Sequence, residues 1–548
     1  MRGKTPRKLA VGAAVLALLA AAAGCSSEDT GGNAPEDLGG DLRVYSGEPE
    51  SLLPTQGAES EGISVMRHLY EGLVSYNAET GKPENAMAQS IESTDQTKWT
   101  IKLKGGYKFD NGEPVNADAY IRAWNYAAYG PNTQGNSYFF DRIVGYGDMQ
   151  TKDPDDDGPK KAPEPKAKEL AGLKKLGDDS FEVTLAEPFA GFPTMLGYTG
   201  FAPLADACIK DAAAAKACDE KPIGNGPFKM DGAWEHKVQI KLVRNPDFPG
   251  NKAKVDRLTY KIYDQLETGY ADFQAGELDI IDSVPPPKYK EAKAAYGDKM
   301  IEQPTTSLTY LGLPIYNPNF QDKKIRQAFS MAIDRQAIID AVFAGQRTPA
   351  KSIAPSLIPG SRETACAACA PDPAKAKALL AEAGGWKGGK VEYWFNAGAG
   401  HETWVQGVAD QIKKNLGVEY TMKGQLQFPE YLANGDNKKF TGPFRLGWSA
   451  DYPLLENYLK PLFGKQGSSN YPSYDNPQFD SLIQQGDGSP NLDEAITFYQ
   501  KAEDIVMEDM PVIPLWFGQS TSIQGEKVKS ITFNRIEELD YATAEMVK

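Results

Sequence analysis

Residues 444–451 read Phe-Arg-Leu-Gly-Trp-Ser-Ala-Asp, and their side chains alternate between two kinds. Alternation with a period of two predicts a β-strand whose side chains point to opposite faces of a sheet. The face expected to pack into the core carries Phe444, Leu446, Trp448 and Ala450. The opposite face carries a cation at one end, an anion at the other and two small residues between them, namely Arg445, Asp451, Gly447 and Ser449.

This second face matches the charges of an extended peptide. A zwitterion could lie along Gly447 and Ser449 as an added strand, with its ammonium group on Asp451 and its carboxylate toward Arg445. At about 3.3 Å per residue the two charges would lie roughly 20 Å apart along the strand, and inward-reaching side chains shorten that distance. Ligands of a few residues would fit, with Trp448 as a further contact. The alternative is a solvent-facing strand with two ordinary charges.

His401 is a second candidate for contact with a ligand. It begins an expected helix over residues 401–416, which Gly417 closes. The unpaired N–H groups and the positive dipole at a helix N-terminus favour a nearby anion. His401 could therefore help to hold a ligand carboxylate, or it could be a plain first residue of a helix.

The N-terminus indicates export. Arg2, Lys4, Arg7 and Lys8 precede an apolar run, Leu9 to Ala23, so residues 1–24 are predicted to be a signal peptide. That run is shorter than the roughly 20 residues that span a bilayer, and no later stretch approaches this length. Residues 22–25, Ala-Ala-Gly-Cys, resemble the lipobox of bacterial lipoproteins, which implies lipidation of Cys25. The alternative is an ordinary cleavage that leaves a free Cys25.

Residues 25–40 are expected to be the lipidated cysteine and a flexible tether, because Gly, Ser and acidic residues dominate them. By random-coil scaling the tether would hold the folded part on the order of 20 Å from the lipid.

Length and charge restrict the class of protein. The chain has 548 residues, of which 41% are hydrophobic and 24% are charged, so several folded domains are expected. Its formal net charge of −15 would repel phosphate backbones, which makes nucleic acid an unlikely partner. Three His residues leave little material for His-based metal sites, and we expect no metal and no cofactor.

Four cysteines remain after Cys25. An even number outside the cell predicts two disulfides, and three pairings are possible. The pairing that closes the shortest loops is Cys208 with Cys218 and Cys366 with Cys369. Cys366-Ala-Ala-Cys369 could instead be a redox motif, but no strand with a flanking Trp leads into it. A zinc site would need a second close pair or a nearby His.

The remaining pattern is a mixture of helices and strands without an internal repeat. Helices are predicted after Asn116 and after Asp372, the second ending before Gly384. Strands are predicted over residues 99–103, 181–185 and 512–516, and residues 151–168 form the clearest internal loop. The mixture predicts an α/β protein with several sheets.

Enzyme motifs are missing. Residues 447–451 fail the G-x-S-x-G pattern at their last position, and residues 401–405 fail H-E-x-x-H. We assign no catalytic residue and expect no enzyme activity. Asp153 to Glu164 satisfies the calcium-loop pattern D-x-D-x-D-G-x5-E, but Pro159 and Pro163 interrupt it, and the alternative is a solvated acidic loop.

Seven motifs in order resemble those of the family 5 extracellular solute-binding proteins, the oligopeptide- and dipeptide-binding proteins of ABC importers. The resemblance runs from about Leu42 to the C-terminus through residues 69–74, 107–114, 224–228, 276–279, 325–329, 332–335 and 448–453. It implies an α/β, two-lobed periplasmic-binding-protein fold of the large peptide-binding type, with an extra small domain and a hinge of two crossover strands. The implied division is lobe I at residues 41–70, 201–305 and 516–548, the small domain at 71–200, and lobe II at 306–515.

The resemblance also implies roles for three residues. In peptide-binding members, the Asp that matches Asp451 binds the ligand α-amino group, the basic residue matching Arg445 can face the ligand carboxylate, and a His at the position of His401 assists with longer peptides. Residues 454–456, Leu-Leu-Glu, depart from the more polar stretch that commonly follows Tyr-Pro, so the pocket walls are expected to differ.

The implied protein is a monomeric substrate-binding lipoprotein on the outer face of the cytoplasmic membrane, which delivers short peptides to the membrane subunits of an ABC permease. The alternatives are another solute on the same fold, such as a cello-oligosaccharide or a chelated metal, or a secreted hydrolase.

Overall fold

The computed structural model describes residues 39–151, 162–465, 467–536 and 538–547. The expected signal peptide, Cys25, nearly all of the tether and most of the calcium-loop pattern lie outside these residues. Of that pattern the structure describes Glu164, whose carboxylate accepts a hydrogen bond from the Tyr129 hydroxyl at 3.2 Å.

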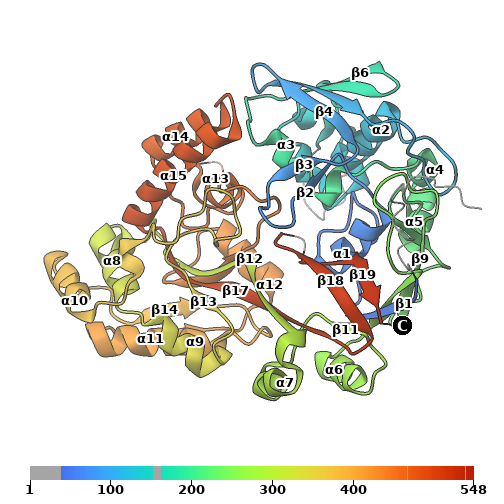
Figure 1. The fold of residues 1–548 in the computed structure, drawn as a ribbon. Coiled ribbons are helices and arrows are strands. Elements are labelled where there is room, and N and C mark those ends of the chain that lie inside the picture. The colour runs from blue at the N-terminus through green and yellow to red at the C-terminus, as the bar shows by residue number, and fades with distance from the viewer. Residues whose placement is uncertain (1–38, 152–161, 466, 537, 548) are drawn as a thin grey trace, which may run out of the picture. The chain divides into compact units, whose positions relative to one another are not determined.

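One large mixed sheet organises the described chain (Figure 1). Its strand order is β15-β14-β16-β12-β17-β11-β1-β10-β9-β8, and β13 (Thr348–Pro349) pairs with β17 off this path. The bounds are β1 (Asp41–Ser46), β8 (Phe228–Met230), β9 (Gln239–Arg244), β10 (Arg257–Ile262), β11 (Ile280–Ile281), β12 (Met300–Gly312), β14 (Val391–Trp394), β15 (Tyr420–Lys423), β16 (Phe444–Trp448) and β17 (Val512–Gln524).

Two long antiparallel strands, β12 and β17, join the two halves of this sheet. Each has 13 residues, and they pair from Gly312 opposite Val512 to Met300 opposite Ile523. One half continues from β12 to β16, and the other continues from β17 to β11 and then to β1. The pairing register shifts between Pro304 and Leu308, in the middle of the pair. These two strands are the expected crossover strands, and the irregular register places the weakest pairing where a hinge would bend.

Residues 71–200, the range expected for the small domain, hold their own sheets. Four antiparallel strands have the order β4-β5-β7-β6, and β2 pairs with β3 in a separate hairpin. The bounds are β2 (Val74–Tyr76), β3 (Pro83–Asn85), β4 (Ala88–Ser93), β5 (Lys98–Leu103), β6 (Leu173–Gly177) and β7 (Ser180–Thr184). Helix α2 (Ala117–Ala128) packs on the four-stranded sheet, because Tyr120 and Trp124 contact the ring of Phe181 in β7.

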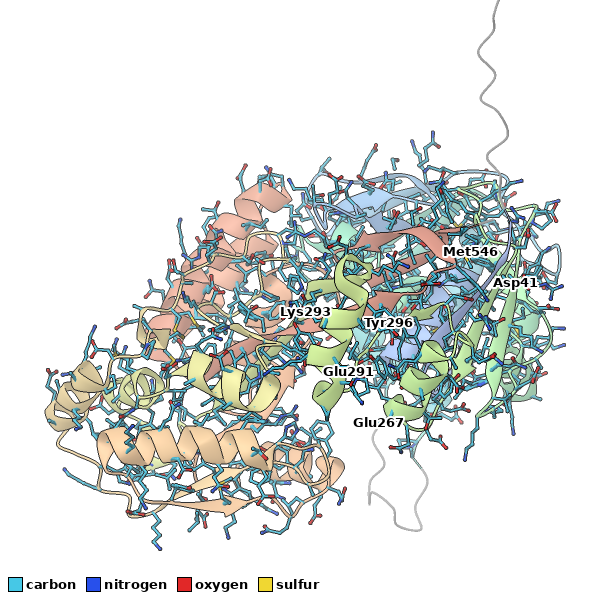
Figure 2. The ribbon with its side chains drawn as sticks, turned by 60° about the horizontal axis from the view of Figure 1, so that its bottom comes forward. Asp41, Glu267, Glu291, Lys293, Tyr296 and Met546 are labelled. Carbon is cyan, nitrogen blue, oxygen red and sulfur yellow. A yellow bond between two sulfur atoms is a disulfide. The ribbon has the colours of Figure 1, made fainter. Side chains whose placement is uncertain are left out.

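A C-terminal hairpin of β18 (Val528–Asn534) and β19 (Glu538–Met546) returns the chain to its start. Strand β19 contacts β1, and Figure 2 shows Met546 beside Asp41. Helix α7, which carries the labelled Glu291, Lys293 and Tyr296 in Figure 2, packs against the beginning of β12 through an ion pair of 2.8 Å between Lys293 and Glu302.

The α-helices of the described chain include those predicted from capping residues. Asn116 caps α2, Asp372 caps α10, and Gly417 ends α11 with a positive φ of 74°, which glycine adopts without strain. The other bounds are α1 (Ser60–Leu69), α3 (Phe192–Met195), α4 (Asp206–Ile209), α5 (Ala212–Glu220), α6 (Leu266–Gln274), α7 (Tyr289–Tyr296), α8 (Lys323–Met331), α9 (Arg335–Phe343), α10 (Pro373–Glu382), α11 (Glu402–Leu416), α12 (Phe428–Asp436), α13 (Glu456–Phe463), α14 (Pro477–Asp487) and α15 (Leu492–Asp509).

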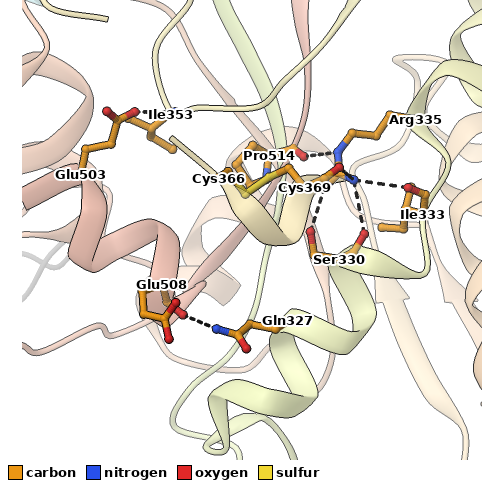
Figure 3. The surroundings of a disulfide bond; sticks show 10 residues. All are labelled: Gln327, Ser330, Ile333, Arg335, Ile353, Cys366, Cys369, Glu503, Glu508 and Pro514. Atoms are coloured by element: carbon orange, nitrogen blue, oxygen red, sulfur yellow. Dashed lines mark hydrogen bonds between the residues drawn. A yellow bond between two sulfur atoms is a disulfide. The ribbon is translucent and has the colours of Figure 1, made fainter. Parts of the chain in front are cut away.

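Two disulfides cross-link the described chain with the pairing that closes the shortest loops. Cys208 and Cys218 join α4 to α5, and Cys366 and Cys369 close a short turn before α10. Figure 3 shows that Arg335 ties this second turn to the crossover strands: its guanidinium donates to the carbonyls of Cys369 at 2.8 Å and of Pro514 on β17 at 2.7 Å. These two hydrogen bonds hold the turn against β17. Burial also lowers the pKa of Arg335 to about 9.

Within the described residues, the helices are too short or too polar to cross a membrane. The same part of the chain holds no group of three or more His, Cys, Asp or Glu residues arranged to bind a metal ion.

Candidate functional site

A cavity of about 790 Å³ lies over the middle of the two crossover strands. Residues 305–307 of β12 and 518–521 of β17 line it. The wall from the β1 half of the sheet includes Tyr45, Ser46, Glu61 and Arg67. The wall from the β16 half includes residues 449–451, directly after β16. Both halves of the sheet thus contribute to one cavity.

Asp451 is held in this wall by Asn457, a buried residue of α13. The backbone N–H of Asp451 donates to Asn457 Oδ1 at 3.0 Å, and Asn457 Nδ2 donates to Asp451 Oδ2 at 3.2 Å. These bonds turn the chain away from the sheet, so β16 ends at Trp448 and the expected strand over residues 444–451 is three residues too long. The predicted alternation is confirmed within β16, where Phe444 and Leu446 are buried and Arg445 and Gly447 are more exposed.

The carboxylate of Asp451 has no cation beside it among the described residues. Burial raises the pKa of Asp451 to about 6, the hydrogen bond from Asn457 opposes this rise, and the nearby charge of Glu456 adds to it. A desolvated carboxylate that lacks a positive partner is costly, and an ammonium group placed against it would remove that cost. Asp451 is therefore a candidate for binding a cation.

Aromatic side chains line the same cavities as this carboxylate. Tyr138, of the short 3-10 helix η2 (Ser137–Phe140), is 50% exposed, and the ring of Phe139 lies 4.2 Å from that of Tyr138 and 4.3 Å from that of Tyr198. Burial raises the pKa of Tyr138 and of Tyr198, and the charge of Asp451 raises both further. Tyr198 lines the larger cavity together with Asp451. A second cavity, of about 670 Å³, shares Asp451 with the first and is lined by Tyr138 and Trp448. Aromatic faces favour a cation at this position.

Arg445 and His401 form a separate cluster of hydrogen-bond donors. Arg445 Nη1 donates to Asn396 Oδ1 at 3.2 Å, while its buried Nε has no acceptor among the described residues. Trp404 Nε1 donates to His401 Nδ1 at 3.3 Å, so the proton of the neutral imidazole is on Nε2, which is also buried without an acceptor. Burial, and then the charge of Arg445, lowers the pKa of His401 to about 4. Two donors near each other without acceptors suit a carboxylate.

The predicted site residues are thus placed in two groups. Ser449 and Asp451 line the larger cavity, Trp448 lines the smaller one, and Gly447 lies exposed in β16 opposite Thr309 of β12. Arg445 and His401 line neither of these two cavities, and the charge of Arg445 contributes to the lowered pKa of His401.

Sequence reasoning missed Arg347, a cation that lines the larger cavity together with Asp451. Its guanidinium donates to the Gln346 carbonyl at 2.6 Å and lies 5.3 Å from the centre of the Phe343 ring, and it forms no ion pair with a described carboxylate. Burial lowers the pKa of Arg347. Arg347 belongs to no motif, and no local pattern distinguishes it from a surface arginine.

Comparison with known proteins agrees with this architecture. The profile of the family described as bacterial extracellular solute-binding proteins, family 5 Middle, matches residues 82–470. The chain belongs to this family. The predicted membership and fold class are thereby confirmed.

The relatives of this protein are named for different solutes. The oligopeptide-binding protein OppA of Bacillus subtilis is 27% identical, with 88% of each chain covered. Heme-binding protein A of Haemophilus influenzae is also 27% identical, with 82% of this chain and 81% of the relative covered. The unliganded open form of the murein tripeptide-binding protein MppA has the same fold, with a TM-score of 0.78, 23% identity, and coverage of 94% of this chain and 98% of that one. Family membership alone therefore does not decide the solute.

The uncompensated charge of Asp451 predicts a stabilising substitution in the ligand-free protein. Asp451→Asn keeps the acceptor for Asn457 and removes the buried charge. Because the folded-state pKa lies above the unfolded one, the penalty of that charge is full above about pH 7, shrinks as pH falls through about 6, and is gone below about pH 4. We expect the variant to be more stable than wild type by about 2 kcal/mol at pH 8, a difference that disappears in acid.

Melting temperatures measured across this pH range by calorimetry would check this expectation. An Asp451→Asn protein that is no more stable than wild type at pH 8 would show that Asp451 is already compensated.

Proposed function

We propose that this protein is the substrate-binding component of an ABC importer, that it captures short peptides between its two lobes, and that it delivers them to the membrane permease. The observation that carries the proposal is the uncompensated carboxylate of Asp451 in the cavity over the crossover strands. The unsatisfied donors of Arg445, near the start of β16, and of His401, at the N-terminus of α11, favour a negatively charged group. A free peptide has an ammonium group and a carboxylate at its two ends, and it satisfies both.

Each group of the ligand has an assigned partner. Asp451 would accept the α-ammonium group, with Tyr138 and Trp448 beside it, and residues 447–449 would lie along the peptide backbone. The carboxylate has two cationic positions available: Arg347 in the cavity of Asp451, and Arg445 with His401 outside it. Two receiving positions at different places along the site would let peptides of more than one length bind.

Binding would close the lobes about β12 and β17. We propose the division given by the sequence, with lobe I at residues 41–70, 201–305 and 516–548, the small domain at 71–200, and lobe II at 306–515. The two inner boundaries, 305/306 and 515/516, fall within the crossover strands. Because the cavity has walls from both halves of the sheet, a ligand there contacts both lobes only when they are close, and that differential contact drives closure.

Thermal stability in the presence of candidate solutes tests the proposal. Di- to pentapeptides are expected to raise the melting temperature of the chain from Ser26 onward, because a ligand at a hundredfold excess over its Kd stabilises the folded state by about 2.7 kcal/mol. The N-acetylated forms of the same peptides should give no shift, since acetylation removes the positive charge that Asp451 binds.

Two variants control this experiment. Asp451→Asn should lose the peptide shift although it is a stable protein, and Glu187→Gln, at an exposed carboxylate of the smaller cavity, should keep it. A shift with cello-oligosaccharides, heme or a chelated metal alone, or an equal shift with N-acetylated peptides, would contradict the peptide assignment. Release of product from a chromogenic peptide or glycoside would favour a hydrolase instead.

We also propose that Cys25 carries a lipid that holds a monomeric protein on the outer face of the cytoplasmic membrane. The motif of residues 22–25 and the membership of an extracellular family support this. Labelled palmitate should be incorporated into the wild-type protein and not into Cys25→Ser, and equal labelling of the two would contradict the anchor.

A further inference from the structure

We infer that Arg142 is a positioning residue that controls the charge state of Asp451 through the buried carboxylate of Glu456, and thereby the pH range in which the site accepts an ammonium group. The inference deepens the proposed function and rests on it for the ligand. The coupling between the three charged groups can be measured without any ligand.

Arg142 reaches from the region of the small sheets to helix α13. Its Nη2 donates to Glu456 Oε1 at 2.7 Å, and its Nη1 lies 3.6 Å from Asp487 Oδ2 at the end of α14. The guanidinium carbon lies 3.9 Å from the centre of the Phe189 ring. The side chain of Glu456 is fully buried, so this ion pair is largely shielded from water. Such a pair is strongly affected when one partner is removed, because the other charge is left buried alone.

Glu456 is in turn adjacent to the support of Asp451. Its Oε2 accepts a hydrogen bond from the Tyr452 hydroxyl at 2.7 Å, so both of its oxygens have donors. The next residue, Asn457, makes both hydrogen bonds to Asp451. The path from Arg142 to the ligand position therefore has three contacts: Arg142 to Glu456, Glu456 to Asn457 along α13, and Asn457 to Asp451.

The charged and titratable groups around Asp451 come from several segments, and Glu61, Arg67, Asp282 and Arg347 line the larger cavity with it. Helix α13 contributes Glu456 and Tyr458, η2 contributes Tyr138, and the chain before the 3-10 helix η4 (Thr199–Phe201) contributes Tyr198. Burial keeps the pKa of each tyrosine above its ordinary value, so these three phenols are neutral near pH 7. Glu456 is thus the neighbour whose negative charge disfavours a charge on Asp451.

A second layer surrounds Glu456. It consists of Arg142, Tyr452, Asp487, the exposed Asp141, Lys460 and Tyr499. Two of these residues contact Asp487: Lys460 Nζ lies 2.9 Å from its carboxylate, and the Tyr499 hydroxyl donates to it at 2.8 Å. Arg142 and Lys460 therefore face Glu456 and Asp487, whereas Asp451 has neither cation beside it. Without Arg142, the negative charge of Glu456 near Asp451 would no longer be offset, and Asp451 would bind a proton at a higher pH.

This arrangement assigns Arg142, which lines the smaller cavity together with Asp451, a role in ligand binding that acts through Glu456. With Arg142 in place, the negative charge of Glu456 is offset and Asp451 is ionised near neutral pH. With Arg142 removed, the pH at which Asp451 ionises should rise by about one unit, so peptide affinity should fall about twofold at pH 7 and nearly tenfold at about pH 5.

The test uses Arg142→Gln, Glu456→Gln, the double variant and Arg142→Lys. For each variant, a second protein is made that also carries Asp451→Asn. The difference in melting temperature between the two proteins of each pair is measured against pH without ligand. The pH at which this difference changes reports the ionisation of Asp451. Peptide Kd is then measured over the same pH range. Arg257→Gln, at an exposed arginine that pairs with Asp231 at 2.7 Å, is the matched control.

Two curves are compared, the difference in melting temperature against pH and the peptide Kd against pH. Arg142→Gln is expected to move the midpoint pH of both curves upward, and Glu456→Gln is expected to move it downward. The double variant should return the midpoint close to wild type, because the charge that Arg142 offsets is then absent. Arg142→Lys and Arg257→Gln should stay near the wild-type midpoint. A structural role alone would lower all melting temperatures without moving the midpoint, and it would not be corrected in the double variant.

Equal midpoints in wild type and Arg142→Gln, or a double variant that behaves like Arg142→Gln, would overturn the inference. If Arg142→Gln does not fold, the double variant carries the test, because its midpoint should lie above that of Glu456→Gln, from which it differs only at Arg142. If wild type binds no peptide, the ligand-free curves still decide the coupling, so failure of the proposed function is distinguishable from failure of this inference.

Discussion

The two hydrogen bonds between Asp451 and Asn457 hold a carboxylate in the wall of a cavity without a cation beside it. The protein maintains this unfavourable charge at the expense of its own stability, because burial keeps the pKa of Asp451 near 6. A ligand ammonium group would supply the missing charge, so part of the free energy lost in folding returns on binding. Such a trade-off between stability and binding is expected where a site is built before its ligand arrives.

Helix α13 links this carboxylate to the rest of the molecule. Asn457 holds Asp451, the Tyr458 hydroxyl donates to the Thr306 carbonyl of β12, and Glu456 pairs with Arg142 from the region of the small sheets. One short helix therefore contacts the ligand position, a crossover strand and a third part of the chain. A change in the angle between the lobes at β12 and β17 would be transmitted to Asp451 through contacts that are buried and rigid.

The sequence predicted those features that depend on neighbouring residues. The caps at Asn116, Asp372 and Gly417 define their helices correctly, and the alternation from Phe444 to Gly447 identifies β16. The expected strand is three residues too long because the backbone N–H of Asp451 donates to Asn457 of α13, a contact across a turn that the alternation does not encode. Arg347 has no local signal, and Arg142 pairs with a residue 314 positions away, a contact that no periodicity encodes. Asp451 and Arg445 are predicted as a pair from their spacing in one expected strand, but the structure places Asp451 beyond the end of β16, in a cavity that Arg445 does not line.

Proton release on peptide binding tests the central claim, that an uncompensated Asp451 receives the ligand ammonium group. A tripeptide would be titrated calorimetrically at about pH 5.5 in two buffers of different ionisation enthalpy. Binding should release on the order of half a proton or more, because the ammonium group lowers the pKa of Asp451 below its ligand-free value of about 6. Asp451→Asn should release none. Tight binding by the wild-type protein without proton release at this pH would contradict the account.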